Sequence, residues 1–172
     1  MPVRKTLTFS EPVLRETAIP VENVLDPHIQ AIITDCVDTM HSEELAGFAA
    51  PQLGESVRIF VSEIRKTKYR NPTETAPLTI YVNPEITWRG EETILDYEGC
   101  GSIPDTFGSV ERASEIKITY LDEAGERCET KANGLLARVI QHEIDHLNGI
   151  LFIDLADPAS LISKAKYLAK KK

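Results

Sequence analysis

Two histidines one helical turn apart carry the clearest chemistry in this chain. His142 and His146 enclose Glu143 in the run Gln-His-Glu-Ile-Asp-His-Leu-Asn, from position 141 to position 148. On a helix with 3.6 residues per turn, side chains four positions apart project from the same face, so both imidazoles can bind one metal ion. Glu143, beside the first histidine, can then reach a water molecule on that ion. The pattern indicates a metal-dependent hydrolase.

The segment that carries these histidines is apolar on most sides of the predicted helix. Its apolar residues are Leu135, Leu136, Val139, Ile140, Ile144 and Leu147. Burying two imidazoles and an acid among such residues without partners would cost several kcal/mol. A bound ligand therefore explains the pattern better than a chance pair of histidines does.

A third metal ligand must come from elsewhere in the chain, because a catalytic metal site usually takes three protein ligands and leaves one place for water. Cys100 is the candidate, since Gly99 and Gly101 leave room for its thiolate to meet a cation. Taken alone, a free core cysteine is the better interpretation of this residue. Cys36 lies on a helical apolar stripe and Cys128 in a strand-like run, and an odd number of cysteines argues against a disulfide framework.

Composition limits the class of protein. With 172 residues, of which 42% are hydrophobic, the chain fits one domain over residues 1–172. The formal net charge of -8 disfavours DNA or general nucleic-acid binding, because phosphates would be repelled. No apolar run approaches the length of a membrane span, and the amino terminus lacks the apolar core of a signal peptide, so we expect a cytoplasmic protein.

Two helices are indicated by their start signals and apolar spacing. Asp26 followed by Pro27 is typical of a helix start, and the spacing predicts a helix that runs to about Ser42. Asn133 is the predicted cap of the metal-binding helix, and Gly149 is a residue that stops it.

The remaining elements are predicted as strands and a closing helix. Runs rich in β-branched and aromatic residues predict strands at 57–64, 78–82, 85–89, 93–97, 116–121 and 127–130. Residues 65–77 are predicted to form an exposed loop, residues 151–155 a short strand or extended piece, and Pro158 to open the closing helix. Short connections favour antiparallel pairing. We therefore expect an α+β fold, with mainly antiparallel sheets around the central metal-binding helix and a helix towards each end.

Three stretches occur in a fixed order along the chain. They read Gly47-Phe48-Ala49-Ala50-Pro51-Gln52, Glu98-Gly99-Cys100-Gly101-Ser102 and His142-Glu143-Ile144-Asp145-His146. Together they resemble the motifs of the peptide deformylase family, metal hydrolases that remove the formyl group from the initiator methionine of new polypeptides. Pro12-Val13-Leu14-Arg15, Asn83-Pro84 and Ile103-Pro104 also look like sequence of this family, so the resemblance covers nearly the whole chain.

The resemblance implies a role for each site residue. One metal ion would be held by Cys100, His142 and His146, with water in the fourth place. Glu143 would be the general base and later the acid, while the Gln52 amide and the Gly101 backbone NH would hold the formyl oxygen. The backbone at Ala46 and Gly47 would pair with the extended peptide like an added strand.

The resemblance also implies a methionine pocket, a metal and a partner. The pocket would be lined by Leu135 and Val139, with Ile103 or its neighbours. Fe²⁺ is the expected metal in the cell, with zinc, nickel or cobalt in purified protein. Residues 164–172 hold five lysines and no acid, and they resemble the carboxy-terminal helix of bacterial deformylases that dock on the ribosome. A helix whose lysines only complement its dipole and aid solubility is the alternative.

Two other functions stay open at the level of sequence. Leu45 stands where the family has a glycine, and Gly101 stands where it usually has leucine, methionine or arginine. A non-catalytic or weakly active relative that binds formyl-peptides or metal is therefore one alternative. The other is a zincin-type metallopeptidase, which shares the His-Glu-x-x-His pattern but takes its third ligand downstream, where this chain has no histidine or cysteine after His146.

Overall fold

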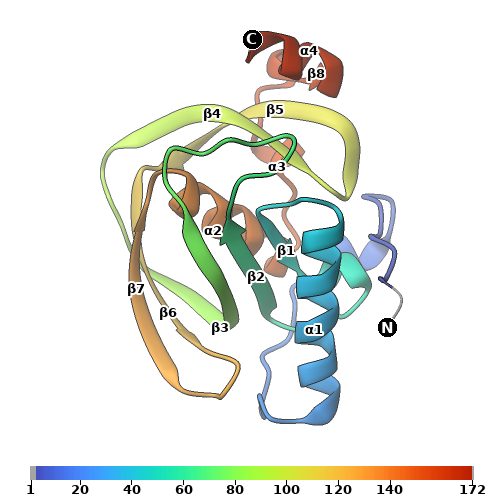
Figure 1. The fold of residues 1–172 in the computed structure, drawn as a ribbon, viewed down its shortest axis with the longest axis vertical. Coiled ribbons are helices and arrows are strands. Elements are labelled where there is room, and N and C mark those ends of the chain that lie inside the picture. Colours follow the sequence, from blue (N-terminus) through green and yellow to red (C-terminus); the bar gives the residue numbers. More distant parts are fainter. Residues whose placement is uncertain (1–2, 172) are drawn as a thin grey trace.

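The computed structural model describes residues 3–171 and contains two antiparallel sheets around one helix (Figure 1). The first sheet has the order β1 (Gly47–Ala49), β2 (Ile59–Ile64), β3 (Ala76–Arg89), β6 (Glu115–Leu121) and β7 (Arg127–Asn133). The second has the order β4 (Thr93–Cys100), β5 (Ile103–Ala113) and β8 (Ile162–Ser163). The predicted α+β class with mainly antiparallel sheets is confirmed.

Four α-helices accompany the sheets in the described residues. They are α1 (Pro27–Ser42), α2 (Gly134–Leu147), α3 (Phe152–Leu155) and α4 (Lys164–Lys170). Single 3-10 turns lie at Pro12–Arg15, Ala50–Leu53 and Pro158–Ser160. None of the helices in residues 3–171 is long and apolar enough to cross a membrane.

The helix α2 packs between the two sheets and carries both histidines (Figure 1). Its apolar side, with Ala137, Ile140, Ile144 and Leu147, joins a buried cluster that includes the stacked rings of Phe60 and Tyr81. Burial of this face fixes the rotation of α2, because apolar residues at helical spacing lie on one stripe. The opposite face is thereby directed towards β4 and β5.

Both predicted helix starts and stops lie where expected, with one difference. Asp26 caps α1, since its side chain accepts a hydrogen bond from the amide of His28 at 2.8 Å. Asn133 occupies the capping position of α2, but its side chain makes no capping bond there. Gly149 follows α2 with a φ of 72°, a left-handed conformation that favours glycine.

Two strand predictions were wrong in extent. Residues 78–82 and 85–89 form one strand, β3, because a bulge after Val82 lets it pass Pro84 without interruption. Asn83 sits in this bulge with a φ of 49°, and its amide bonds to both the NH and the carbonyl of Val21. The whole of β5 was missed, because Pro104, Gly108 and its charged residues hide a strand that pairing with β4 makes.

The carboxy-terminal predictions also need correction. Residues 151–155 are not a strand: Leu151 precedes the short helix α3, where Asp154 accepts the amide hydrogen of Leu151 at 2.8 Å. The closing helix does not begin at Pro158, since a 3-10 turn and β8 intervene. The pairing of β8 with β5 keeps this segment extended, and Ser163 then caps α4.

The amino-terminal segment runs along the body of the molecule and ties two loops together. The amide of Leu7 donates to the carbonyl of Gln52, and the amide of Phe9 donates to the carbonyl of Ser102, both at 2.9 Å. Gln52 and Ser102 belong to different motifs, separated in the sequence by β2, β3 and β4. The segment therefore holds the 3-10 turn at Ala50–Leu53 against the turn between β4 and β5.

Candidate metal centre

The three predicted ligands, which come from the end of β4 and from α2, meet at one point. The ligand atoms of Cys100, His142 and His146 all lie within 4.8 Å of one another. Cys100 Sγ lies 3.2 Å from His146 Nε2, and the two imidazole centroids are 5.0 Å apart in an edge-on arrangement. Residues far apart in the sequence thus form one compact set of nitrogen and sulfur donors.

This donor set fits a divalent transition metal. A thiolate and two imidazoles are ligands that such ions prefer, and three of them leave a coordination place for water. Burial raises the pKa of the Cys100 thiol, but the charge of His146 and hydrogen bonds from both histidines outweigh it and hold that pKa well below its ordinary value. The cysteine is therefore set up as the thiolate that metal binding needs.

Glu143 lies beside this cluster with one carboxylate oxygen unused. Its side chain is buried, and Oε2 has no hydrogen-bond partner among the described residues. Burial raises the pKa of Glu143 to about 7, although His142 and His146 act in the opposite direction. A carboxyl group with such a pKa can both take and release a proton near neutrality.

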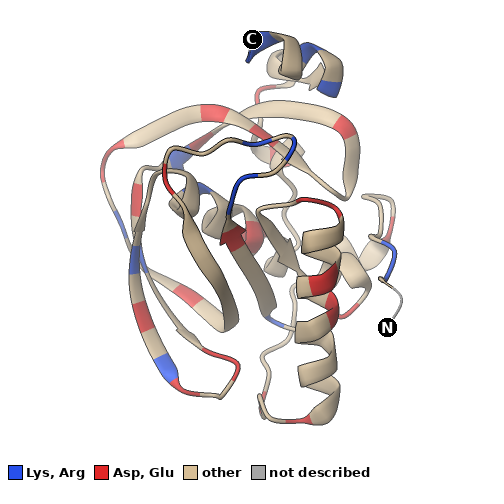
Figure 2. Ribbon diagram, in the orientation of Figure 1, with Lys and Arg blue, Asp and Glu red and all other residues tan. Residues whose placement is uncertain are grey.

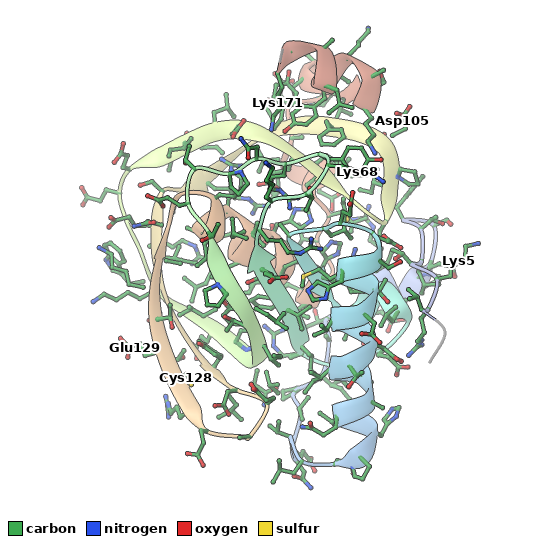
Figure 3. The ribbon with its side chains drawn as sticks, viewed as in Figure 1. Lys5, Lys68, Asp105, Cys128, Glu129 and Lys171 are labelled. Atoms are coloured by element: carbon green, nitrogen blue, oxygen red, sulfur yellow. The ribbon has the colours of Figure 1, made fainter. Side chains whose placement is uncertain are left out.

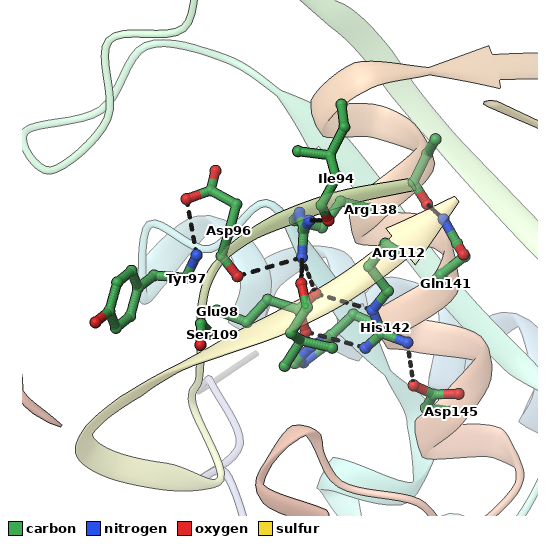
Figure 4. Close-up of polar contacts among 12 residues, drawn as sticks. Ile94, Asp96, Tyr97, Glu98, Ser109, Arg112, Arg138, Gln141, His142 and Asp145 are labelled. Atoms are coloured by element: carbon green, nitrogen blue, oxygen red, sulfur yellow. Dashed lines mark hydrogen bonds and ion pairs between the residues drawn. The ribbon is translucent and has the colours of Figure 1, made fainter. Parts of the chain in front are cut away.

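Glu98 orients His142 and is the centre of a buried charge network (Figure 4). Its Oε2 accepts hydrogen bonds from His142 Nδ1 at 2.9 Å and from Arg112 Nη2 at 3.0 Å. Its Oε1 accepts from Arg112 Nε at 2.9 Å and from Arg138 Nη1 at 2.8 Å. Because Nδ1 of His142 is engaged in this way, Nε2 is left for a metal ion.

The network extends to the ends of both elements that carry ligands. Arg112 also pairs with Asp145, and Arg138 donates to the carbonyls of Ile94 and Val110 at 2.6 and 2.8 Å. Burial opposes the charged form of Glu98, but the bonds from His142 and Arg112 outweigh it and lower the pKa of Glu98 well below its ordinary value. The carboxylate therefore stays ionised between its two arginines.

Sequence reasoning gave no role to Glu98, Arg112 or Arg138, although two signals for them exist. Glu98 lies two positions before Cys100 in the Glu-Gly-Cys-Gly-Ser stretch, a spacing at which side chains in a strand share a face. Arg138 precedes His142 by one helical turn and shares its face. Arg112 carries no such signal, because it lies in β5, the strand that the sequence did not reveal.

Gln52 turns its amide nitrogen towards the thiolate. Its Oε1 accepts the amide hydrogen of Ala49 at 2.9 Å, which leaves Nε2 to donate. Nε2 lies 3.1 Å from Ser102 Oγ and 3.6 Å from Cys100 Sγ. Gln52 is buried, so this donor has a fixed direction.

A cavity of about 470 Å³ opens in front of these groups. It is lined by the predicted site residues Ala46, Gly47, Gln52, Cys100, Gly101, Ile103, Leu135, Val139, His142 and Glu143. His146 is almost fully buried and completes the ligand cluster without lining the cavity. Other lining residues were not predicted, among them Arg70 and four residues of the α4 region, Lys164, Tyr167, Leu168 and Lys171.

Gly47 allows β1 to approach α2 closely. A Cβ atom at this position would lie 2.5 Å from Oε1 of Glu143 and 2.8 Å from Cγ1 of Val139. Such distances are far below van der Waals contact, so only glycine fits without displacing Glu143. The requirement for glycine at this position is steric. The position of the Glu143 carboxylate therefore depends on how closely the β1 backbone approaches α2.

Leu45 and Gly101 are neighbours in space. A Cβ atom on Gly101 would lie 3.2 Å from Cδ1 of Leu45 and 3.1 Å from Oε2 of Glu43. Leu45 thus occupies the space into which a side chain at position 101 would extend. The two departures from the family pattern therefore form one packing arrangement.

Comparison with known proteins agrees with this geometry. The sequence profile described as polypeptide deformylase matches residues 3–161. The chain belongs to the polypeptide deformylase family. A peptide deformylase from Bartonella quintana is 40% identical over 175 residues, which cover 100% of this chain and 96% of that protein.

Solved structures of peptide deformylases share the fold. The enzyme from Thermotoga maritima superimposes with a TM-score of 0.80 at 37% identity, covering 92% of this chain and 100% of that chain. The enzyme from Acinetobacter baumannii, solved with Met-Ala-Ser bound, gives a TM-score of 0.86 at 35% identity, covering 90% and 98%.

Peptide deformylases are metal-dependent hydrolases of protein biosynthesis that remove the N-formyl group from the initiator methionine of nascent peptides. Membership of this family favours neither the non-catalytic alternative nor the zincin-type peptidase.

Proposed function

We propose that this chain deformylates N-formylmethionyl peptides with the residues that meet at the candidate metal centre. The metal ligands are Cys100, His142 and His146. Glu143 moves the protons, and the Gln52 side chain and the Gly101 backbone NH hold the formyl oxygen. The observation that carries this assignment is the buried, unpartnered Oε2 of Glu143 beside three converging donor atoms.

The proton transfers follow from the position of Glu143. When bound, a divalent metal would supply Lewis acidity at the formyl group and lower the pKa of water. Glu143 takes a proton from the water that attacks the formyl carbon. It then passes that proton to the methionine nitrogen as the C–N bond breaks, giving formate and a peptide with a free amino group.

The formyl oxygen gains negative charge during the attack and needs donors that are already in place. Nε2 of Gln52 is directed by the bond from Ala49 to Oε1, so it does not have to reorganise. The Gly101 backbone NH requires no side chain, so glycine at this position keeps the role. Each such donor contributes about 3 kcal/mol to the transition state in comparable sites.

The peptide backbone adds to the free edge of β1. Among residues 3–171, this strand pairs only with β2 in its sheet. The carbonyl of Ala46 bonds towards β2, to the amide of Glu63, whereas the amide of Ala49 bonds away from it, to Gln52. Alternation along the strand then directs the NH and carbonyl of Gly47 into the cavity, where an extended substrate can pair with them. Leu135 and Val139 receive the methionine side chain.

Further features stay predictions. We expect Fe²⁺ in the cell, as the resemblance to the family implies, and zinc, nickel and cobalt suit the same thiolate and two imidazoles. We also expect one domain over residues 1–172 and a cytoplasmic location. Ribosome docking through residues 164–172 is a further proposal, supported by the basic residues visible on α4 (Figure 2).

An assay of the Glu143→Gln variant tests the proposed function. Glutamine keeps the size of the side chain but cannot take a proton, so turnover of formyl-Met peptides should fall about 100-fold or more. Metal content, measured by elemental analysis, should stay near one per chain. Cys100→Ser and His142→Ala are the matched ligand variants, in which metal content should fall sharply.

Acetyl-Met peptides provide the substrate control, and the native protein should turn them over far more slowly than formyl-Met peptides. Near-native turnover by Glu143→Gln at full metal occupancy would refute the role of Glu143. Full metal content in both ligand variants would refute the ligand set.

A further inference from the structure

The outer end of the cavity carries basic groups that the deformylation chemistry does not use. Arg70 comes from the loop between β2 and β3, and Lys164 and Lys171 come from the α4 region. Figure 2 shows basic residues on both α4 and this loop, and Figure 3 shows Lys68 on the loop and Lys171 at the end of α4. We call Arg70, Lys164 and Lys171 the basic rim.

Four acids that line the same cavity have partners within the chain, and one of these, Glu44, is paired with a cation. Glu43 accepts the hydroxyl hydrogen of Thr6 at 2.6 Å, and Glu44 pairs with Lys68 at 3.5 Å. Asp105 accepts the amide hydrogen of Lys164 at 3.1 Å. Asp96 likewise accepts the amide hydrogen of Tyr97, at 2.7 Å.

The basic rim, in contrast, has no carboxylate partner among residues 3–171. Nη1 of Arg70 is buried there without a hydrogen-bond partner. Lys164 Nζ lies 4.2 Å from the ring centre of Tyr69, and Lys171 Nζ lies 4.7 Å from that of Tyr167. Aromatic faces attract these ammonium groups but leave their hydrogens free to bind an anion.

The rim is held in place by packing. Tyr167 stacks on Phe107 of β5 with ring centres 4.1 Å apart, which fixes α4 on the second sheet. Arg70 is set by a turn in which Thr67 donates its amide hydrogen to the Arg70 carbonyl at 2.8 Å. Burial lowers the pKa of Arg70 while Tyr167 raises it, so the guanidinium is poorly solvated and close to α4. An anionic ligand would offset the cost of that burial by pairing with the guanidinium.

We propose that Arg70, Lys164 and Lys171 form a subsite that binds an acidic side chain of the nascent peptide, downstream of its methionine. This inference rests on the proposed function, because the same cavity must first hold the formylmethionine. An extended peptide advances roughly 3.3 Å per residue and alternates its side chains, so only certain positions after the methionine reach the rim. The enzyme thereby prefers nascent chains that carry an acidic residue at such a position.

A matched set of peptides tests the subsite. The peptides are formyl-Met-Ala-Xaa-Ala-amide and formyl-Met-Ala-Ala-Xaa-amide, with Glu, Gln or Lys at Xaa, and the amide removes the terminal carboxylate. In low salt we expect kcat/KM to be about threefold to tenfold higher for Glu than for Gln at one of the two positions, and lowest for Lys. Raising NaCl to 0.5 M, an ionic strength at which charges are strongly screened, should reduce the preference.

Variants identify the residues responsible. In Arg70→Gln combined with Lys164→Gln and Lys171→Gln, the Glu-to-Gln ratio should fall to about one. Lys166→Gln is the matched control, because Lys166 is on the same helix but does not line this cavity, and it should keep the native ratio. Lys164→Glu with Lys171→Glu should reverse the order and favour the Lys peptide, a gain that misfolding cannot produce.

The outcomes separate the two proposals. Equal turnover of the Glu, Gln and Lys peptides by the native protein would overturn the subsite and leave the proposed function standing. A Glu preference that persists in the triple Gln variant would overturn the assignment to the basic rim. Failure to deformylate any of the peptides, with metal bound, would contradict the proposed function itself.

Discussion

The two ends of the cavity use charge in opposite ways. At the inner end, Glu98, Arg112 and Arg138 are nearly fully buried, with side-chain exposures of 4%, 7% and 9%, and each is paired. At the outer end, Lys164 and Lys171 rest on aromatic rings and have no carboxylate partner in the described chain. Chemistry on one formyl group requires a fixed geometry, whereas recognition of variable peptide sequences suits long side chains that can adjust.

The largest effect should come from breaking the inner network with Glu98→Ala. The change leaves Arg112 and Arg138 buried without their shared carboxylate and removes the partner of His142. We expect the free energy of unfolding to fall by about 3–5 kcal/mol, as measured by urea denaturation. Metal content should fall as well, because His142 loses the bond that orients it.

An exposed ion pair supplies the control for this prediction. Glu115 and Lys131 lie 2.8 Å apart with side-chain exposures of 41% and 53%, and Glu115→Ala should change stability by no more than about 1 kcal/mol. If Glu98→Ala and Glu115→Ala lowered the free energy of unfolding equally, burial would not strengthen the ion pairs of the inner network.

Gly47→Ala should give the next largest effect, because the added methyl group perturbs the inner end of the cavity by steric overlap. The added methyl group overlaps Glu143 and Val139, and overpacking of this kind costs about 1–3 kcal/mol. Displacing the carboxylate should also reduce kcat/KM for formyl-Met peptides, by about 100-fold for a shift of about 1 Å. Gly90→Ala is the matched control, since its Cβ would meet Trp88 and Glu115 no closer than 3.4 Å. Native activity in Gly47→Ala would show that β1 can move without cost.

The smallest effect should appear at Leu45 and Gly101, which also line the cavity. Gly101→Leu alone should destabilise the protein, because Leu45 fills the space that the new side chain needs. Adding Leu45→Gly should recover part of the loss, with a coupling energy of about 0.5–3 kcal/mol in a double-mutant cycle. Additive effects of the two changes would show that the two residues are independent. The cycle is measured by chemical denaturation.

Sequence reasoning succeeded where a local pattern carries the information. The spacing of His142 and His146 identified α2, and the Asp26-Pro27 pair identified the start of α1, because caps and helical periodicity depend on neighbours in sequence. The motif around Cys100 supplied the third candidate ligand through its resemblance to a family.

Other features depend on contacts between distant residues and left no local trace. β5 forms because β4 lies beside it, and its own composition does not predict a strand. Arg112 lies in β5, so its role was missed as well. The basic rim was also hidden, because the lysine-rich end predicted a solvated helix, whereas Tyr167 packs on Phe107 and brings Lys164 and Lys171 into the cavity.

The bonds made by the amino-terminal segment have a consequence in time. Leu7 and Phe9 leave the ribosome well before the residues to which they bond, because their amides donate to the carbonyls of Gln52 and Ser102. This segment must therefore wait until Ser102 has been made before it can take its final place, and His146 is made later still. A growing copy of this chain gains its candidate metal centre only after His146 has left the ribosome.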